Sequence, residues 1–362
     1  MTTDVVIVGG GVIGLATAHE LLRRGVAVTV LERASCGREA SWAGGGILSP
    51  LMPWDYTDPV TQLTQASIKL FPELIESLKL KTGIDPEYQT SGLLALSGNF
   101  GERDAVAEAW CAHNVFPIKK IPAREIAPEL TCDGAALWLP SVTQVRNPRL
   151  LQALAKSVEK SGGSIIEYAE VTSWKIERGR VVAAITSQGE YTAANFVIAA
   201  GAWSRPLLGE HACKLDIRPV RGQMLLFKAE PGLLRTIILQ DGFYLIPRQD
   251  GHILAGSTLE EAGFDKSTTD SAREVLLAKA RALLPQLTAE MLAGHWAGLR
   301  PGSPDNIPVI DRHPAIANLY LNSGHHRYGV TMAPASAHLL ANRLLDLPQL
   351  FDITPYAWPM EK

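Results

Sequence analysis

The chain has 362 residues, of which 46% are hydrophobic and 20% are charged, and its formal net charge is −3. This size and composition are typical of a globular protein with two lobes and exclude a disordered or coiled-coil chain. No stretch concentrates Lys and Arg on one face, which disfavours nucleic acid as a main partner. The four cysteines are scattered without CxxC spacing. The sequence thus predicts no metal site and no disulfide framework, and we expect free thiols in a reducing compartment, the cytoplasm.

The chain begins with a pattern typical of one βαβ unit. The apolar run at residues 5–8 predicts a strand, the apolar spacing after Gly14 predicts a helix, and residues 28–31 predict a second strand. Asp4 stands where a signal peptide would carry a basic residue, and glycines interrupt the apolar run. We therefore expect a core strand here, without a signal peptide or a membrane span.

Between the first strand and the helix lies a GxGxxG pattern. Gly9 permits a sharp turn, Gly11 lets the backbone approach a pyrophosphate, and Gly14 lets the helix pack closely on the sheet. The helix then begins with free N–H groups that favour phosphate. Glu32, which follows the second strand, can accept hydrogen bonds from ribose hydroxyls. The pattern predicts a dinucleotide site, and the alternative is a tight turn in a sheet without a ligand.

A second glycine cluster, residues 44–46, follows shortly after the ribose end of the expected site. It indicates another close approach of backbone to an extended ligand, and FAD extends further in this direction than NAD. We therefore favour FAD over NAD. The alternative for residues 37–47 is a flexible loop.

The middle of the chain alternates helical and strand patterns. We expect a helix at 58–80, with Pro72 marking a break or a new first turn, then a strand at 93–96, a helix at 104–111, a peripheral lobe at 121–139, a helix at 149–161 and a strand at 164–171. Residues 174–176, 181–186 and 191–198 predict an antiparallel meander. Small residues around Gly201 then allow the chain to pass near a cofactor, or a strand to pack closely on a helix.

The last third predicts strands, two helices and a further helix start. The strands are expected at 218–227, 242–247, 254–257, 295–301, 306–310 and 319–322, and the helices at 272–284 and 333–345. Residues 323–332 repeat the sequence of strand, small residues and helix start. Such a helix start can stabilise negative charge on a reduced isoalloxazine ring.

Several side chains of this region are candidates for substrate contacts. Arg300 ends a strand and offers a rigid fork for a carboxylate, unless it pairs with Asp305 or Asp311. Tyr244 lies on an alternating strand, so its hydroxyl either points into a cavity as a second donor or belongs to a half-buried core. Arg327 is a second cation at the flavin edge or a solvated loop residue. His325 and His326 either tune the site or lie at the surface.

Seven motifs make the chain similar to one family over nearly its whole length. These are VVIVGGGVIGLATAHEL, LER, SWAGGGILSP, VIAAGAWS, YLIPR, GLRPGSPDNIPVI and GHHRYGVTMAPA. The chain resembles the FAD-dependent D-amino-acid oxidase superfamily, and within it most closely the glycine oxidases of bacterial thiamine biosynthesis. The resemblance implies an α/β fold in which a Rossmann-like, glutathione-reductase-type FAD-binding domain (1–85, 145–215 and 297–362) joins an antiparallel-sheet α+β substrate domain (86–144 and 216–296).

The resemblance also implies roles for residues at the site. Arg300 would hold the substrate carboxylate, with Tyr244 and Arg327 beside it. Flavin contacts are implied at Val12, Ile13, Glu32, Arg33, Ala40, Ser41, Gly45, Gly46, Ile47, Val171, His325, His326, Arg327, Tyr328, Gly329, Val330 and Thr331. Sarcosine oxidases attach flavin through a C-terminal cysteine, and no cysteine follows Cys213 here, so we expect non-covalent FAD.

The expected reaction is oxidation of glycine, sarcosine or D-alanine by hydride transfer to flavin N5. Glycine would give glyoxylate, ammonia and H2O2 with O2 as the oxidant, feeding thiazole formation in thiamine biosynthesis, and we expect a homo-oligomer. The alternatives are a D-amino-acid dehydrogenase that passes electrons to a quinone, the flavoprotein lobe of a tRNA-modifying enzyme, and a non-catalytic nucleotide-binding module.

Overall fold

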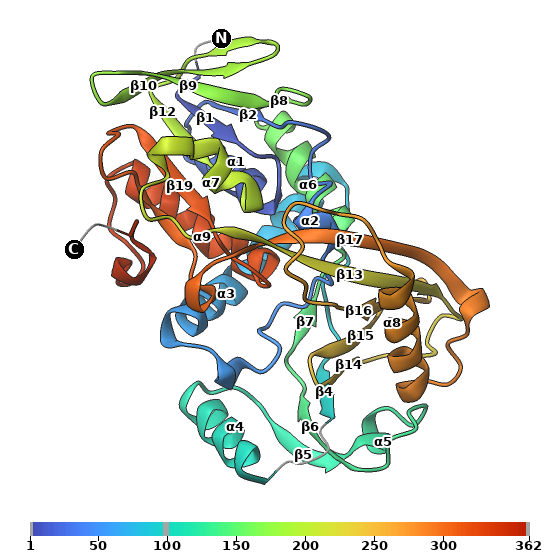
Figure 1. Ribbon diagram of the computed structural model, residues 1–362. Helices are drawn as coiled ribbons and strands as arrows, with labels where there is room; N and C mark the ends of the chain where they lie inside the picture. Colours follow the sequence, from blue (N-terminus) through green and yellow to red (C-terminus); the bar gives the residue numbers. More distant parts are fainter. Residues whose placement is uncertain (1–2, 97–100, 360–362) are drawn as a thin grey trace.

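A computed structural model describes residues 3–96 and 101–359 (Figure 1). Its strands form two large sheets and two small ones. The first large sheet has the order β18-β19-β12-β1-β2-β8 and is parallel except for β18, which runs antiparallel to β19. Its strands are β1 (Val5–Val8), β2 (Val28–Leu31), β8 (Ser164–Ile166), β12 (Asn195–Ile198), β18 (Val309–Arg312) and β19 (Leu319–Ser323).

This six-stranded sheet is covered on both faces, which is why its strands are almost wholly apolar. Val5 and Ile7 of β1 pack among helices, and the alternate residues Val6 and Val8 pack toward a three-stranded antiparallel sheet. The helices of the first layer are α1 (Val12–Arg23), α3 (Asp58–Thr82), α6 (Asn147–Lys160) and α9 (Gly329–Leu344). The small sheet consists of β9 (Val171–Glu177), β10 (Arg180–Thr186) and β11 (Gly189–Tyr191).

The prediction that residues 191–198 form the last strand of the meander is wrong. The chain leaves the small sheet after Tyr191, and β12 instead lies between β1 and β19 in the parallel sheet. The reason is burial on both faces, since three consecutive residues of β12, from Phe196 to Ile198, are fully buried. The strand expected at 164–171 is likewise two strands, β8 and β9, in different sheets.

Pro72 neither breaks nor restarts its helix, because α3 is continuous from Asp58 to Thr82. Pro72 costs the helix a main-chain hydrogen bond. Its buried neighbours Phe71, Ile75 and Leu78 pack into a core shared with α1 and α6, and this packing holds the helix together across the proline.

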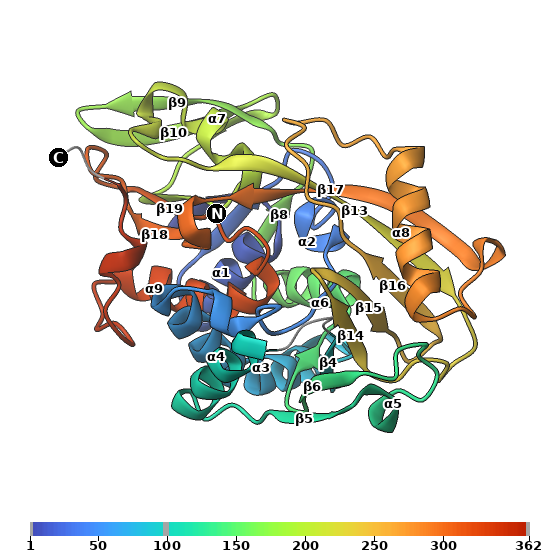
Figure 2. The same ribbon diagram turned by 60° about the horizontal axis from the view of Figure 1, so that its bottom comes forward.

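The second large sheet is antiparallel except where β4 runs parallel to β14, and its order is β17-β13-β16-β15-β14-β4-β6-β5. Its strands are β4 (Leu93–Leu96), β5 (Lys119–Pro122), β6 (Ala135–Leu139), β13 (Arg218–Lys228), β14 (Ile237–Gln240), β15 (Phe243–Pro247), β16 (His252–Gly256) and β17 (Leu292–Gly302). One face packs against α8 (Asp270–Leu283) and α5 (Ala123–Ile126), and Figure 2 shows α8 lying along this sheet.

The remaining elements are short or peripheral. They are α2 (Ala40–Ala43), the pair β3 (Gln89–Thr90) and β7 (Thr143–Gln144), α4 (Gly101–His113) and α7 (Ser204–Leu208). The helix expected at 104–111 is therefore confirmed with longer ends. In the described part of the chain, no helix has the length and apolar character needed to cross a membrane.

The long strands β13 and β17 connect the two halves of the molecule. Both belong to the antiparallel sheet, where they pair along their length, and they run side by side across the middle of the molecule in Figure 1. The predicted α/β fold class is thus confirmed. A largely parallel, Rossmann-like sheet lies beside a largely antiparallel one. The domain boundaries stay a prediction, and β17 runs through the one at residues 296 and 297.

Candidate active site

One cavity of about 470 Å³ is lined by residues of both large sheets. Its walls include the β1–α1 turn, the end of β2, the second glycine cluster and the start of α9, and also residues of β13, β15 and β17. Every residue predicted to contact substrate or cofactor lines this cavity except Gly14. The lining residues among them are Gly9, Gly11, Val12, Ile13, Glu32, Arg33, Ala40, Ser41, Gly45, Gly46, Ile47, Val171, Gly201, Tyr244, Arg300, His325, His326, Arg327, Tyr328, Gly329, Val330 and Thr331.

The glycines of the first turn allow backbone segments to pack without side chains. Gly9 has a φ of +116°, and a Cβ there would lie 2.4 Å from the carbonyl oxygen of Ala199. A Cβ on Gly14 would lie 1.9 Å from the carbonyl oxygen of Gly9, so Gly14 brings the helix against the strand end and does not face the cavity. These positions match the separate tasks expected of the two glycines.

Helix α1 begins at the cavity wall without a capping side chain, because its N-cap residue is Gly11. The N–H of Val12 donates to Oγ of Ser41 over 2.9 Å, which fixes the second glycine-rich segment beside the helix start. The positive end of α1 thus faces the cavity, where it can stabilise an anion such as a pyrophosphate.

Glu32 presents a fixed carboxylate next to this helix start. Its Oε2 accepts the N–H of Gly10 at 2.7 Å, its Oε1 accepts the N–H of Ala34 at 3.1 Å, and the residue is buried. Beside it, the guanidinium of Arg33 lies 3.6 Å from the ring centroid of Trp203 and donates to Oε1 of Glu39 over 2.6 Å. A buried acid held by backbone amides fits a ribose diol.

Hydrogen bonds from side chains outside the second glycine cluster hold its backbone. Asn147 donates from Nδ2 to the carbonyl oxygens of Ser41 (2.8 Å) and Gly44 (3.0 Å). Arg248 donates from Nη2 to the carbonyl oxygen of Gly45 over 2.7 Å. Burial lowers the pKa of Arg248 to about 10. Its hydrogen bond to the Gly45 carbonyl holds the backbone of the glycine cluster in place.

The C-terminal part of the cavity is the loop that enters α9. This helix begins at Gly329, four residues before the predicted start at 333, because a turn through His325–Tyr328 already sets its first residues. Thr331 in its first turn donates to the carbonyl oxygen of Ile47 over 3.0 Å. The helix start therefore lies against the second glycine cluster.

Two histidines of this loop are neutral at pH 7. Burial lowers the pKa of His325 to about 3, and burial together with the charges of Arg300 and Arg327 lowers the pKa of His326 to about 4. His325 is 1% exposed, so the surface alternative is wrong for it, and its Nε2 lies 2.9 Å from Oγ of Ser336. Within residues 3–96 and 101–359, its buried Nδ1 has no hydrogen-bond partner.

Arg300 is oriented by neutral acceptors. Its Nη2 donates to Oγ of Ser257 over 2.6 Å, and its Nη1 donates to the carbonyl oxygens of Thr258 (3.2 Å) and Arg221 (3.4 Å). Burial lowers its pKa, and among the described residues no carboxylate pairs with it. The alternative pairing with Asp305 or Asp311 is therefore wrong, and Asp311 accepts instead from the guanidinium of another arginine, Arg343.

Tyr244 and Arg327 lie at the same end of the cavity as Arg300. The nearby Tyr244 hydroxyl raises the pKa of Arg300, and the Arg327 charge lowers it. Tyr244 is 8% exposed and its hydroxyl also donates to Sδ of Met224 over 3.3 Å. Arg327 lines the cavity, so it is not simply a solvated loop residue. This end of the cavity combines two cations with a phenol, and such a set is suited to binding a small carboxylate.

Sequence reasoning missed further lining residues, among them Asn147, Met224 and Ser257. Each comes from an element whose pattern indicates only ordinary packing, and their contacts with the site are long-range. The donor set of the cavity fits FAD, because two helix starts, a buried acid, a glycine cluster held by hydrogen bonds and His325, whose buried Nδ1 has no partner among the described residues, all contribute to its lining. Within the described ranges no cluster of three metal-ligating side chains occurs.

Comparisons with known proteins agree with this geometry. A family model described as FAD dependent oxidoreductase matches residues 4–343. Glycine oxidase from Pseudomonas aeruginosa is 45% identical over 364 residues, which covers 99% of each chain. The crystal structure of glycine oxidase from Geobacillus kaustophilus has a TM-score of 0.93 and 30% identity over 99% of each chain. The bifunctional protein ThiO/ThiG of Trichormus variabilis is 32% identical over 96% of this chain and 53% of its own length.

Proposed function

Because this chain belongs to the FAD-dependent oxidoreductase family, we propose that it binds FAD without a covalent bond and oxidises glycine and related small amines. The observation that carries the proposal is Arg300, a cavity-lining guanidinium without a carboxylate partner among the described residues. A substrate carboxylate would supply the missing negative charge. The names of two similar proteins, both glycine oxidases, support the same substrate class.

Residues from both ends of the chain would hold the cofactor. The β1–α1 turn would take the pyrophosphate, Glu32 the ribose hydroxyls, and residues 45–47 and 325–331 the isoalloxazine half. When bound, FAD would supply a two-electron acceptor that O2 can reoxidise, giving H2O2. The start of α9 would favour negative charge at that half, because the N-terminal end of a helix is positive.

The protein would contribute mainly position at the substrate end. Arg300 would hold the carboxylate, Tyr244 would add a hydroxyl donor, and Arg327 a second cation, so that the Cα–H of the substrate is fixed toward the flavin. No general base is needed beyond loss of the ammonium proton to solvent. His325 and His326 are neutral at pH 7, so they add no positive charge that would repel the ammonium group.

The test is a spectrum of the purified protein followed by anaerobic additions of glycine, sarcosine and D-alanine in turn. We expect a yellow protein that glycine bleaches and that air restores with release of H2O2, with glyoxylate and ammonia as products. A colourless protein that takes up no added FAD contradicts the proposal. Bleaching followed by reduction of a quinone-like dye without peroxide identifies the dehydrogenase alternative.

Three further expectations belong to this proposal. The product would feed thiazole formation in thiamine biosynthesis, which loss of growth without thiamine in a deletion strain would test. All four cysteines are free thiols, which supports a reducing compartment such as the cytoplasm. The homo-oligomer stays a prediction that light scattering tests.

A further inference from the structure

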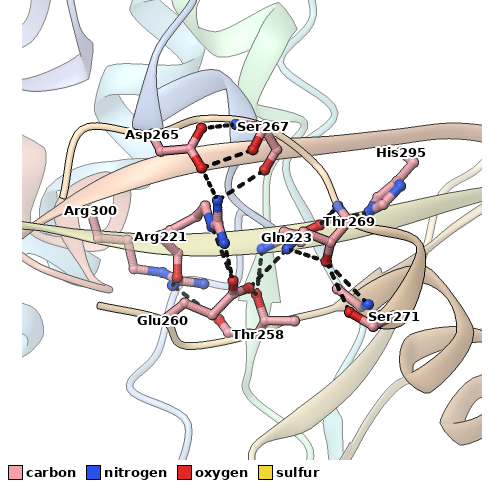
Figure 3. Close-up of polar contacts among 11 residues, drawn as sticks. Arg221, Gln223, Thr258, Glu260, Asp265, Ser267, Thr269, Ser271, His295 and Arg300 are labelled. Atoms are coloured by element: carbon pink, nitrogen blue, oxygen red, sulfur yellow. Dashed lines mark hydrogen bonds and ion pairs between the residues drawn. The ribbon is translucent and has the colours of Figure 1, made fainter. Parts of the chain in front are cut away.

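The segment between β16 and α8, residues 257–269, lies across β13 beside Arg300 (Figure 3). We call it the strap. Arg221 of β13 and Glu260 of the strap form a small antiparallel bridge, in which the N–H of Arg221 donates to the Glu260 carbonyl (2.9 Å) and the N–H of Glu260 to the Arg221 carbonyl (3.0 Å). Main-chain hydrogen bonds thus hold the strap against β13.

The side chains of the same two residues form an ion pair, which is a second contact between the strap and β13. The guanidinium of Arg221 donates from Nε and Nη2 to Oε2 of Glu260 over 3.0 and 2.5 Å. Its Nη1 donates to Oδ2 of Asp265 (2.7 Å) and to the carbonyl oxygen of Ser267 (3.2 Å). Arg221 is buried, whereas the side chains of Glu260 and Asp265 are 28% and 56% exposed. The fork geometry of the guanidinium suits these contacts.

The second oxygen of Glu260 joins a neutral network. Its Oε1 accepts from Nε2 of Gln223 over 2.9 Å and from the hydroxyl of Thr258 over 2.5 Å. That hydroxyl also accepts the N–H of Gln223 at 2.8 Å. Gln223 is fully buried and bonds Thr269 through both ends of its amide. Glu260 is therefore the centre of the contacts between the strap and β13.

The acceptors that orient Arg300 are parts of this assembly. Ser257 and Thr258 belong to the strap, and the third acceptor is the carbonyl of Arg221, which also receives the N–H of Glu260. The two arginines on neighbouring strands thus differ in their partners. Arg221 is neutralised by two strap carboxylates, whereas Arg300 has none in the part of the chain that the structure describes.

The far end of the strap is also held. Phe264 packs on Trp203 with ring centroids 5.5 Å apart, and Nζ of Lys266 lies 2.9 Å from Oε1 of Glu39. The residues that contact Arg300, Ser257 and Thr258, lie between the end of β16 and Glu260. A change at Glu260 therefore acts directly on the segment that contacts Arg300.

We propose that the Arg221–Glu260 pair is a positioning pair for Arg300, which sets the strap acceptors so that the guanidinium of Arg300 meets a substrate carboxylate in one orientation. This inference rests on the proposed function, in which Arg300 binds that carboxylate. Glu260 and Arg221 act through Arg300, and neither needs to touch the substrate.

The experiment measures the affinity of the FAD-loaded protein for acetate by calorimetry, together with kcat and KM for glycine. The variants are Glu260→Gln, Arg300→Ala and the double variant, and the matched control is Glu261→Gln, which removes an exposed neighbouring carboxylate that lies 3.7 Å from Arg218. We expect Glu260→Gln to weaken acetate binding and raise KM for glycine roughly tenfold, with kcat within about twofold and with flavin content unchanged. The control should match the wild type.

The double variant separates positioning from a general structural role. If Glu260 acts through Arg300, Glu260→Gln costs nothing further in the Arg300→Ala background, because coupled residues are non-additive. Full additivity, or a Glu260→Gln protein that binds acetate like the wild type, overturns the inference. Should Glu260→Gln fail to fold, Thr258→Val decides in the same way, since it keeps the carbonyl that Arg300 uses and removes the hydroxyl bonded to Glu260.

The two proposals fail differently. A wild-type protein that binds no acetate and is not bleached by glycine removes the proposed function, and the inference falls with it. A wild-type protein that does both, beside an unaffected Glu260→Gln variant, overturns only the positioning role.

Discussion

The guanidinium of Arg300 lies against the Cα of Gly222 on the neighbouring strand. A Cβ on Gly222 would lie 2.2 Å from both Nη1 and Nη2 of Arg300. β13 and β17 pair antiparallel with Val220 opposite Arg300 and Gly222 opposite Gly298, so Gly222 is a diagonal neighbour of Arg300 on the adjacent strand. The position of the Arg300 guanidinium, the proposed carboxylate-binding group, thus depends on the absence of a Cβ at Gly222 on the adjacent strand.

Gly222→Ala should therefore displace Arg300 while the sheet remains intact. We expect kcat/KM for glycine to fall on the order of 100-fold, because a displacement of about 1 Å at a binding group has that effect. FAD content should stay normal, and Gly134→Ala is the control, since a Cβ there meets only an ordinary contact at 3.7 Å. Unchanged glycine kinetics in the Gly222 variant would show that Arg300 is not the group that positions the substrate.

Glu32→Gln should weaken FAD binding. Two backbone N–H groups hold the carboxylate of Glu32 at the cavity wall. There it would accept a ribose hydroxyl, and a hydrogen bond to a carboxylate contributes roughly 1.5–3 kcal/mol. A loss of that order in FAD affinity, measured by titration of the apoprotein, is expected. Glu190→Gln on an exposed strand is the control. Equal FAD affinity in the two variants would remove Glu32 from the ribose site.

His325 should make the folded state sensitive to acid. Its folded pKa is about 3, well below the ordinary value of 6.5. Between about pH 6.5 and 3, His325 is protonated in the unfolded chain but not in the folded protein. Its contribution to the free energy of unfolding is therefore complete above pH 6.5 and is lost progressively as the pH falls below that value. One such group contributes about 1.4 kcal/mol per pH unit.

Denaturant unfolding at pH 7, 6 and 5 tests this assignment. His325→Gln should lose less stability per pH unit than the wild type, by up to about 1.4 kcal/mol, whereas His113→Gln at an exposed position should follow the wild type. Parallel pH dependence in wild type and His325→Gln would contradict a buried neutral histidine.

The sequence patterns whose residues come together at the cavity are local ones. The glycines of the β1–α1 turn, the acid at the end of β2 and the start of α9 each stand within a short motif, and a turn or helix end needs few neighbours to be recognised. The misplaced strand at 191–198 shows the limit. Phe196 belongs to the parallel sheet because β1 and β19 lie on either side of it, and its own segment does not carry that information.

The contacts that orient the site are the part that could not be predicted. Three whole strands, β14 to β16, and helix α8 separate Gly222 from Arg300 in the chain, and Arg248 reaches the second glycine cluster across the fold. The partners of a buried arginine depend on register and on strand neighbours, which a single sequence does not display. The choice between a free Arg300 and one paired with Asp305 or Asp311 therefore needed the structure.

The central claim, that Arg300 binds the carboxylate of the substrate next to bound FAD, is tested most directly by anaerobic reduction of wild-type and Arg300→Ala protein with glycine and with methylamine. We expect Arg300→Ala to keep its flavin. Its kcat/KM for glycine should fall by an amount that corresponds to about 2–5 kcal/mol of lost transition-state stabilisation. Methylamine, which has no carboxylate, should reduce both proteins equally slowly. Near-normal reduction of Arg300→Ala by glycine would contradict the claim.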